Sequence, residues 1–208
     1  MNRIKIVGIG PGHKDYILPI AYKTIEEADL LIGGSRNLEV FQDYKKETLC
    51  YEGNLKEIVE TMAIQKENNK KIVVLVSGDT GFYSLLDYIK NFFSDEDIEV
   101  IPGISSFQYL FSRLKRSYKG YGLYSLHGRD IQVDAYIEKH QGVFLLTDEK
   151  NTPSSIVTSI MDAYGHWKMI VGENLSYENE KITQGKVKDF RKKEFSKLCV
   201  VVIEKYVE

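Results

Sequence analysis

The chain has 208 residues, of which 43% are hydrophobic and 28% are charged, and its formal net charge is -2. This length suits one or two α/β lobes with a packed core. A near-neutral charge argues against a general nucleic-acid binder, which normally carries a basic excess. No apolar run approaches the roughly 20 residues that a membrane helix needs.

The two cysteines, Cys50 and Cys199, lie far apart and lack metal-ligand spacing. We therefore expect buried free thiols in a reducing compartment and no metal site. The first residues lead straight into a predicted strand, without a signal-peptide pattern. We expect a cytoplasmic protein.

The first lobe is predicted to alternate strands and helices. Strands are expected at residues 4–9, 30–32, 72–76 and 98–101, and helices at 15–28, from 54 onward, at 82–93 and at 107–114. Such strand–helix steps are typical of a parallel sheet with helices on both faces.

Residues 72–84, IVVLVSGDTGFYS, form the stretch around which this lobe is organised. The apolar run predicts a strand buried on both faces. Gly78 and Gly81 carry no Cβ, so the backbone there can approach a ligand closely. Asp79 either accepts hydrogen bonds from such a ligand or only caps the next helix. These two interpretations are about equally favoured by the residues alone.

Residues 8–12, GIGPG, form a glycine loop at the end of the first predicted strand. They resemble the start of a dinucleotide-binding fingerprint, but His13 stands where the third glycine would be. Pro11 also stiffens the loop. A nicotinamide site is therefore weakly supported, whereas a loop that lies against a flat or bulky ligand fits.

The basic segment 112–122 is predicted to connect the lobes, either as a solvated linker or as a rim that attracts an acidic substrate. The expected lobes span residues 1–114 and 115–208. In the second, strands are expected at 123–126, 143–146, 169–172, 181–187 and 198–203, with helices at about 131–140 and from Thr152-Pro153 onward. The last two strands have no helix between them, which predicts a hairpin and hence a mixed sheet.

Four turns at predicted strand ends carry a family resemblance: residues 8–12, 77–81, 102–106 and 172–175. In this order and spacing they resemble the tetrapyrrole methylase family of S-adenosylmethionine-dependent methyltransferases, over nearly the whole chain. The family usually has proline after the Gly-Asp pair, where this chain has Thr80. The resemblance implies an α/β, two-lobe class III methyltransferase fold, an active site in the cleft between the lobes, and a homodimer.

Four further segments resemble one branch of this family: LIGGSR at 31–36, SLHGR at 125–129, LLTD at 145–148 and VGENLSY at 171–177. That branch methylates carbon 5 of precorrin-7 or cobalt-precorrin-7 during construction of the corrin ring of cobalamin. Some of its members are fused to a decarboxylating C-15 methyltransferase. Here such a partner would be a separate protein.

The resemblance also implies roles for individual residues. Gly78, Asp79 and Phe82 would lie beside the methionine part of S-adenosylmethionine, followed by Ser105 and Ser106, and Pro11 would face the cleft. Leu146 or Thr147, and Asn174 or Leu175, would hold the adenine. From the residues alone, Ser105-Ser106 is more simply an N-cap.

The implied acceptor is a tetrapyrrole polycarboxylate, with or without cobalt. A guanidinium pairs with carboxylates in a bidentate way, which makes Arg36 and Arg129 the candidates for binding it, together with Gly10. His127 is a candidate base for removing a ring proton, although a structural role is more common for a lone histidine.

Methyl transfer from a sulfonium needs alignment more than a protein nucleophile. This agrees with the absence of a nucleophile–base motif in the sequence. Two alternatives stay open. In the first, the same fold acts on another tetrapyrrole, on RNA or on a modified histidine. In the second, the chain is a non-catalytic module that carries a tetrapyrrole.

Overall fold

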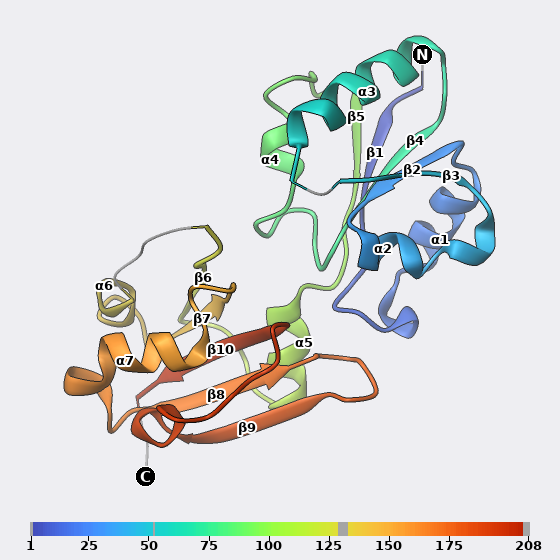
Figure 1. Ribbon diagram of the computed structural model, residues 1–208. Coiled ribbons are helices and arrows are strands. Elements are labelled where there is room, and N and C mark those ends of the chain that lie inside the picture. The colour runs from blue at the N-terminus through green and yellow to red at the C-terminus, as the bar shows by residue number, and fades with distance from the viewer. Residues whose placement is uncertain (1, 52, 129–132, 206–208) are drawn as a thin grey trace. The chain divides into compact units, whose positions relative to one another are not determined.

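The computed structural model describes residues 2–51, 53–128 and 133–205. The chain divides into two compact units, Met1–Ser105 and Ser106–Glu208. Each unit contains a five-stranded sheet of its own (Figure 1). Among the described residues, none of the helices combines the length and the apolar character needed to cross a bilayer.

The first sheet is parallel throughout and has the order β3-β2-β4-β1-β5. Its strands are β1 (Ile4–Gly8), β2 (Leu30–Gly33), β3 (Glu47–Cys50), β4 (Ile72–Val76) and β5 (Ile98–Ile101). The predicted parallel sheet is thus confirmed. Strand β3 was not predicted, because this edge strand is mostly exposed and has no apolar run.

Helices cover both faces of this sheet, as predicted (Figure 1). They are α1 (Pro19–Glu26), α2 (Ser35–Glu39), α3 (Leu55–Glu67) and α4 (Leu86–Ile89), with short 3-10 turns η1 (Lys14–Tyr16) and η2 (Gln42–Tyr44). Met62 of α3 packs with Ile6 and Val74 on one face. Ile25 of α1 packs with Val7 and Leu75 on the other. Successive strand residues face opposite ways, so β1, β2, β4 and β5 each supply both cores, whereas β3 contributes only Leu49 to one of them.

Helix α4 is much shorter than the predicted helix at 82–93. Tyr83 has a left-handed backbone (φ 51°), which a right-handed helix does not accept. The Ser84 hydroxyl donates to the Thr80 carbonyl, and its oxygen accepts from the Leu86 backbone N–H at 3.1 Å. Helix formation therefore begins only after this turn.

The second sheet has the order β6-β7-β10-β8-β9. Its strands are β6 (Tyr121–Ser125), β7 (Gly142–Leu146), β8 (Lys168–Glu173), β9 (Lys181–Lys186) and β10 (Cys199–Glu204). Strands β6 and β7 are parallel and the other pairs are antiparallel, which confirms the mixed sheet. The hairpin predicted from the last two strands is wrong: β9 pairs with β8, and β10 lies between β7 and β8. Strand β10 is apolar and fully buried, so it takes the centre, whereas the polar β9 forms an edge.

The helices of the second unit are α5 (Ser106–Arg113), α6 (Asp134–Ile137), α7 (Pro153–Tyr164) and the 3-10 turn η3 (Val187–Phe190). Val157 of α7 packs with Val171 and Val201 on one face of the sheet. On the other face, Leu110 of α5 reaches Gly172, 3.2 Å from where a Cβ would stand. Helix α5, which lies before the expected lobe boundary at 114, thus packs in the second unit.

Two predicted helix starts are confirmed by their caps. The Asn54 side chain accepts from the Glu57 backbone N–H, and the Thr152 hydroxyl oxygen accepts from that of Ser155. Helix α6 is shorter than the predicted 131–140, of which residues 131–132 lie outside the described chain.

Candidate active site

The turns that follow β4, β1 and β5 lie together at one edge of the first sheet. These three strands are neighbours, and parallel strands end at the same edge, which is where open α/β sheets bind ligands. Gly10 and Gly78, both with positive φ, exchange two backbone hydrogen bonds of 3.1 and 2.7 Å. The first two turns are therefore joined through their backbones.

Only glycine fits where the third turn meets the others. A Cβ on Gly103 would lie 2.2 Å from the Gly78 carbonyl oxygen and 2.7 Å from the Gly8 carbonyl carbon. A Cβ on Gly8 would lie 2.6 Å from the Gly103 nitrogen. The turns after β1, β4 and β5 thus form one closely packed backbone cluster.

Asp79 ties this cluster together. Its Oδ1 accepts from the Gly81 backbone N–H at 2.9 Å, within its own turn. Its Oδ2 accepts from the Gly103 N–H at 3.1 Å, in the turn after β5. Helix α4 begins only at Leu86, so Asp79 does not cap it. Each carboxylate oxygen retains a second lone pair that can accept a further hydrogen bond from a ligand. A contact between Asp79 and a ligand stays a prediction.

The second unit repeats this device with Asp148, directly after β7. Its Oδ1 accepts from the backbone N–H groups of Lys150 and Asn151 at 2.9 and 2.6 Å. Its Oδ2 accepts from the Gly128 N–H at 2.8 Å, in the turn after the neighbouring strand β6. Burial acts to raise the pKa of Asp148, but these three donors and nearby His127 outweigh it and hold that pKa below its ordinary value.

The four residues predicted to hold an adenine lie at one edge of the second sheet. Leu146 ends β7, Asn174 follows β8, and Cys199 at the start of β10 lies between them. The Thr147 hydroxyl donates to the Cys199 carbonyl at 2.6 Å, and the Asn174 N–H donates to the Leu198 carbonyl at 2.9 Å.

Asn174 and Leu175 form a tight corner after β8. Asn174 has a positive φ of 47°, and its side-chain oxygen accepts from the Ser196 hydroxyl at 2.8 Å. Leu175 is buried against Gly172. Within this edge, Leu146 and Leu175 supply apolar surface and the backbone supplies polar groups.

The remaining residues predicted to bind the methyl donor lie in or near the first-unit turns and at the start of α5. Ser105 is buried and Ser106 begins α5. Pro11 is half-buried in the glycine loop, and the Phe82 ring packs edge-on against that of Tyr83, with centroids 5.0 Å apart.

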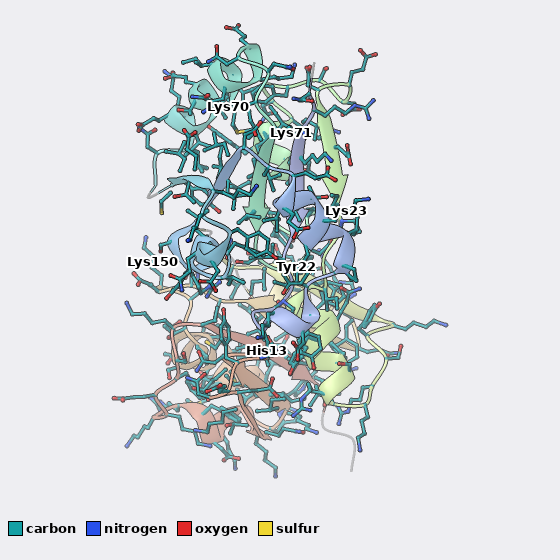
Figure 2. All side chains as sticks on the ribbon, turned by 90° about the vertical axis from the view of Figure 1, so that its right-hand side faces the viewer. His13, Tyr22, Lys23, Lys70, Lys71 and Lys150 are labelled. Carbon is teal, nitrogen blue, oxygen red and sulfur yellow. The ribbon has the colours of Figure 1, made fainter. Side chains whose placement is uncertain are left out.

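The segment after the glycine loop is held in place by side-chain contacts that were not predicted from the sequence. His13 accepts from the Asp15 N–H at 3.2 Å, and the Tyr22 hydroxyl donates to the Lys14 carbonyl at 2.9 Å (Figure 2). A Cβ on Gly10 would lie 2.8 Å from the Tyr16 carbonyl oxygen, so this segment packs directly on the loop.

Arg36 lies beside the turn after β4. It is exposed in α2, and its Nη2 donates to the Ser77 hydroxyl oxygen at 3.3 Å. Ser77 in turn donates to the side-chain oxygen of buried Asn37 at 2.9 Å. This chain of hydrogen bonds places a guanidinium next to Gly78 and Asp79.

Sequence reasoning missed Tyr51, which follows the unpredicted strand β3. Its ring atoms lie 4.0 Å from where a Cβ would stand on Gly34. Burial raises the pKa of Tyr51, against the opposing effects of the Gly34 backbone and the charge of Arg36. A tyrosine side chain therefore lies near Arg36. Finding it from the sequence required prediction of strand β3, which it follows.

His127 is exposed in the turn after β6, and its backbone N–H donates to the Ser125 hydroxyl oxygen at 3.2 Å. The next residue, Gly128, donates its N–H to Asp148 Oδ2, so the turn that carries His127 is bonded to the turn after β7. Arg129 lies outside the described residues. Within the described ranges, no three His, Cys, Asp or Glu side chains are arranged to hold a metal ion.

Comparisons with known proteins agree with this fold. A family model described as Tetrapyrrole (Corrin/Porphyrin) Methylases matches residues 3–191. The probable cobalt-precorrin-7 C(5)-methyltransferase of Methanocaldococcus jannaschii is 39% identical over 210 residues, covering 97% of each chain. The cobalt-precorrin-7 C(5)-methyltransferase of Salmonella typhimurium is 33% identical, covering 86% of this chain and 88% of its own. Among solved structures, precorrin-6Y methylase from Archaeoglobus fulgidus shares the fold, with a TM-score of 0.74, 20% identity and 99% of both chains covered.

Proposed function

The chain belongs to the tetrapyrrole methylases, methyltransferases whose methyl donor is S-adenosylmethionine, and on this premise we propose that it methylates carbon 5 of cobalt-precorrin-7 or precorrin-7. The observation that carries the proposal is the 39% identity to the M. jannaschii relative along 97% of both chains. A relative of that similarity and coverage supports the same acceptor as well as the same reaction.

The donor supplies a methyl group already activated by a positive sulfur. Its fit is supported by glycine turns whose backbone polar groups lie at the carboxyl ends of parallel strands. We assign Gly78, Asp79 and Phe82, with Pro11, Ser105 and Ser106, to the methionine part, and Leu146, Thr147, Asn174 and Leu175 to the adenine. Their task is alignment, which contributes up to roughly 7–11 kcal/mol in well-oriented reactions.

For the acceptor we assign Arg36, Gly10 and Arg129, with Tyr51 beside Arg36. A guanidinium presents a planar fork that matches a carboxylate, and Ser77 orients that of Arg36. Arg36→Lys keeps the charge but loses the fork. We expect kcat/KM for the acceptor to fall about tenfold, the loss of one charge-assisted hydrogen bond.

Donor affinity is expected to stay unchanged in Arg36→Lys, as measured by calorimetry with S-adenosylhomocysteine. Arg191→Lys, an exposed site in the second unit, is the control and should leave both quantities unchanged. Equal turnover by Arg36→Lys and the parent protein would remove Arg36 from the acceptor site.

His127 is our candidate for the base that takes the ring proton. Asp148 supports this role by holding the turn that carries His127, because its Oδ2 accepts from the adjacent Gly128 N–H at 2.8 Å. We further propose a cytoplasmic homodimer that acts with a separate decarboxylating C-15 methyltransferase. The family resemblance supports these last assignments.

The decisive test is incubation of the purified protein with donor carrying a 13C methyl group and, separately, with cobalt-precorrin-7 and precorrin-7. We expect mass spectrometry to show one added methyl and NMR to place it on carbon 5. Unchanged acceptor mass with retained acceptor binding would instead indicate a non-catalytic carrier. A methyl at another carbon would refute the proposed position, and salt-sensitive RNA binding would favour an RNA acceptor.

A further inference from the structure

A cavity of about 830 Å³ opens at one end of the second sheet. Its floor follows a single row of paired residues: Tyr121 begins β6, Gly142 begins β7, Glu204 ends β10 and Lys168 begins β8. Three of these residues, Tyr121, Glu204 and Lys168, line it. The cavity volume is within the range of small-molecule sites.

This end of the sheet is opposite the one predicted to hold the adenine. Gly142 and Leu146 are the two ends of β7. Four residue-to-residue steps of extended strand separate them, which corresponds to about 13 Å. The cavity therefore does not belong to the proposed donor site.

Cations from four separate segments surround the cavity. Arg116 follows α5, Lys139 follows α6, Lys168 begins β8 and Lys205 follows β10. The acidic lining residues are Glu138 and Glu204, so the lining carries a formal excess of two positive charges in a chain whose net charge is -2. A concave surface concentrates such a field and attracts anions.

Buried Glu204 holds part of this lining in place. Its Oε1 accepts from Arg116 Nη1 at 2.5 Å and lies 3.7 Å from Lys168 Nζ, and its Oε2 accepts from the Tyr121 hydroxyl. One carboxylate thus orients two cations and leaves most of their N–H donors available to other acceptors, since a guanidinium has five N–H groups and an ammonium three. Lys139 and Lys205 are exposed at the rim. Across the lining, hydrogen-bond donors outnumber carboxylate acceptors.

From this arrangement we propose that the cavity is a second binding site, for a small molecule that carries two or more anionic oxygen groups. Carboxylate and phosphate groups share the required chemistry, because both accept charge-assisted hydrogen bonds from Arg and Lys. The cations come from different sides of the cavity, so a multivalent anion engages more of them than a monovalent one does.

The test is calorimetry of the full chain at low ionic strength with tricarballylate, inorganic tripolyphosphate and acetate. We expect one of the two multivalent probes to bind more tightly than acetate, with an affinity that falls as salt is added. Tighter binding of tricarballylate would identify a polycarboxylate ligand, and tighter binding of tripolyphosphate a phosphorylated one.

The variant pair Lys139→Gln/Lys205→Gln should weaken that binding at least about tenfold. The matched pair Lys188→Gln/Lys192→Gln removes the same charge from exposed positions outside the cavity and should leave it unchanged. No multivalent binding at millimolar concentration, or equal weakening by both pairs, would overturn the proposal. Donor affinity and methyl transfer, measured on the same variants, are expected to match the parent, which separates this test from that of the proposed function.

Discussion

Asp79 joins two turns of the proposed donor site through its side chain. Its two oxygens accept backbone N–H groups from two different turns, at Gly81 and Gly103. Asp79→Asn keeps one acceptor oxygen and replaces the other by an NH2 group, so that two hydrogen-bond donors face each other. We expect a loss of about 1–3 kcal/mol in the free energy of unfolding, because one backbone donor is left unpaired.

The same substitution should weaken S-adenosylhomocysteine binding at least about tenfold, because the turn at Gly103 loses its hydrogen bond to the turn that contains Gly78 and Asp79. Urea unfolding and calorimetry measure the two effects. Asp87→Asn, at an exposed position of α4, is the control and should change neither. Parent-like stability together with tenfold weaker binding would point instead to direct contact between Asp79 and the donor.

Asp148 makes stability depend on pH in a defined direction. Its pKa is lower in the folded protein than in the unfolded chain, so folding favours its charged form. That contribution is fully present above the unfolded value of about 4 and disappears as the pH falls through the folded value. The difference in unfolding free energy between the parent and Asp148→Asn should therefore be largest near neutral pH and shrink below about pH 4. Urea titrations from pH 7 to pH 3 measure it; a difference that grows on acidification would contradict this assignment.

At the scale of elements, backbone packing between turns is what builds the first-unit site. A methyl group on Gly103 would overlap the Gly78 carbonyl, and neither backbone can yield as a flexible side chain does. We expect Gly103→Ala to lower the free energy of unfolding by about 3 kcal/mol, the upper end of overpacking penalties. We also expect it to abolish binding of the methyl donor.

Gly53→Ala is the matched comparison for that change. Gly53 has a left-handed backbone (φ 90°), which Gly103 does not, but nothing lies within 4 Å of its missing Cβ. Gly53→Ala should lower the free energy of unfolding by only about 1–2 kcal/mol, the penalty of a left-handed conformation. Thermal unfolding of both variants measures the difference, and equal losses would mean that overlap at Gly103 is relieved by movement of the turns.

At the scale of the whole molecule, the two units have separate cores, and each contains one cysteine. Cys199 is buried in the core of the second unit, as expected, but Cys50 ends the mostly exposed strand β3 and is itself exposed, so its predicted burial is wrong. Burial raises the pKa of the Cys199 thiol, partly offset by Thr147, so little reactive thiolate is present. Labelling of Cys199 therefore reports on opening of the second unit.

If the second-unit residues assigned to the adenine bind the donor, S-adenosylhomocysteine should protect Cys199. In a Cys50→Ser variant, we expect labelling by a thiol reagent to slow by about a factor of a hundred at a ligand concentration one hundred times Kd, provided that opening releases the ligand. A Cys199→Ser variant, labelled at exposed Cys50, serves as the control for direct effects of the ligand on the reagent. An unchanged Cys199 rate would mean that these second-unit residues do not bind the donor.

The sequence by itself determined the elements whose signals are local. The apolar run of β4, the caps at Asn54 and Thr152 and the order of strand–helix steps each depend on residues only a few positions apart, so the parallel and mixed sheets were both predictable. The family resemblance, which rests on four ordered turns, identified the class of enzyme.

Only the tertiary structure decided which distant segments meet. Asp79 bonds to Gly103 because β4 and β5 flank β1. Strand β10 lies at the centre of its sheet, where pairing with β7 and β8 satisfies the backbone polar groups of a strand that is buried throughout. The exposed edge strand β3 and the delayed start of α4 depend on pairing and turn contacts that leave no periodic pattern. Hydrogen bonds and packing between residues far apart in the chain have no signature in local spacing, and here they build both the turn cluster and the cationic cavity.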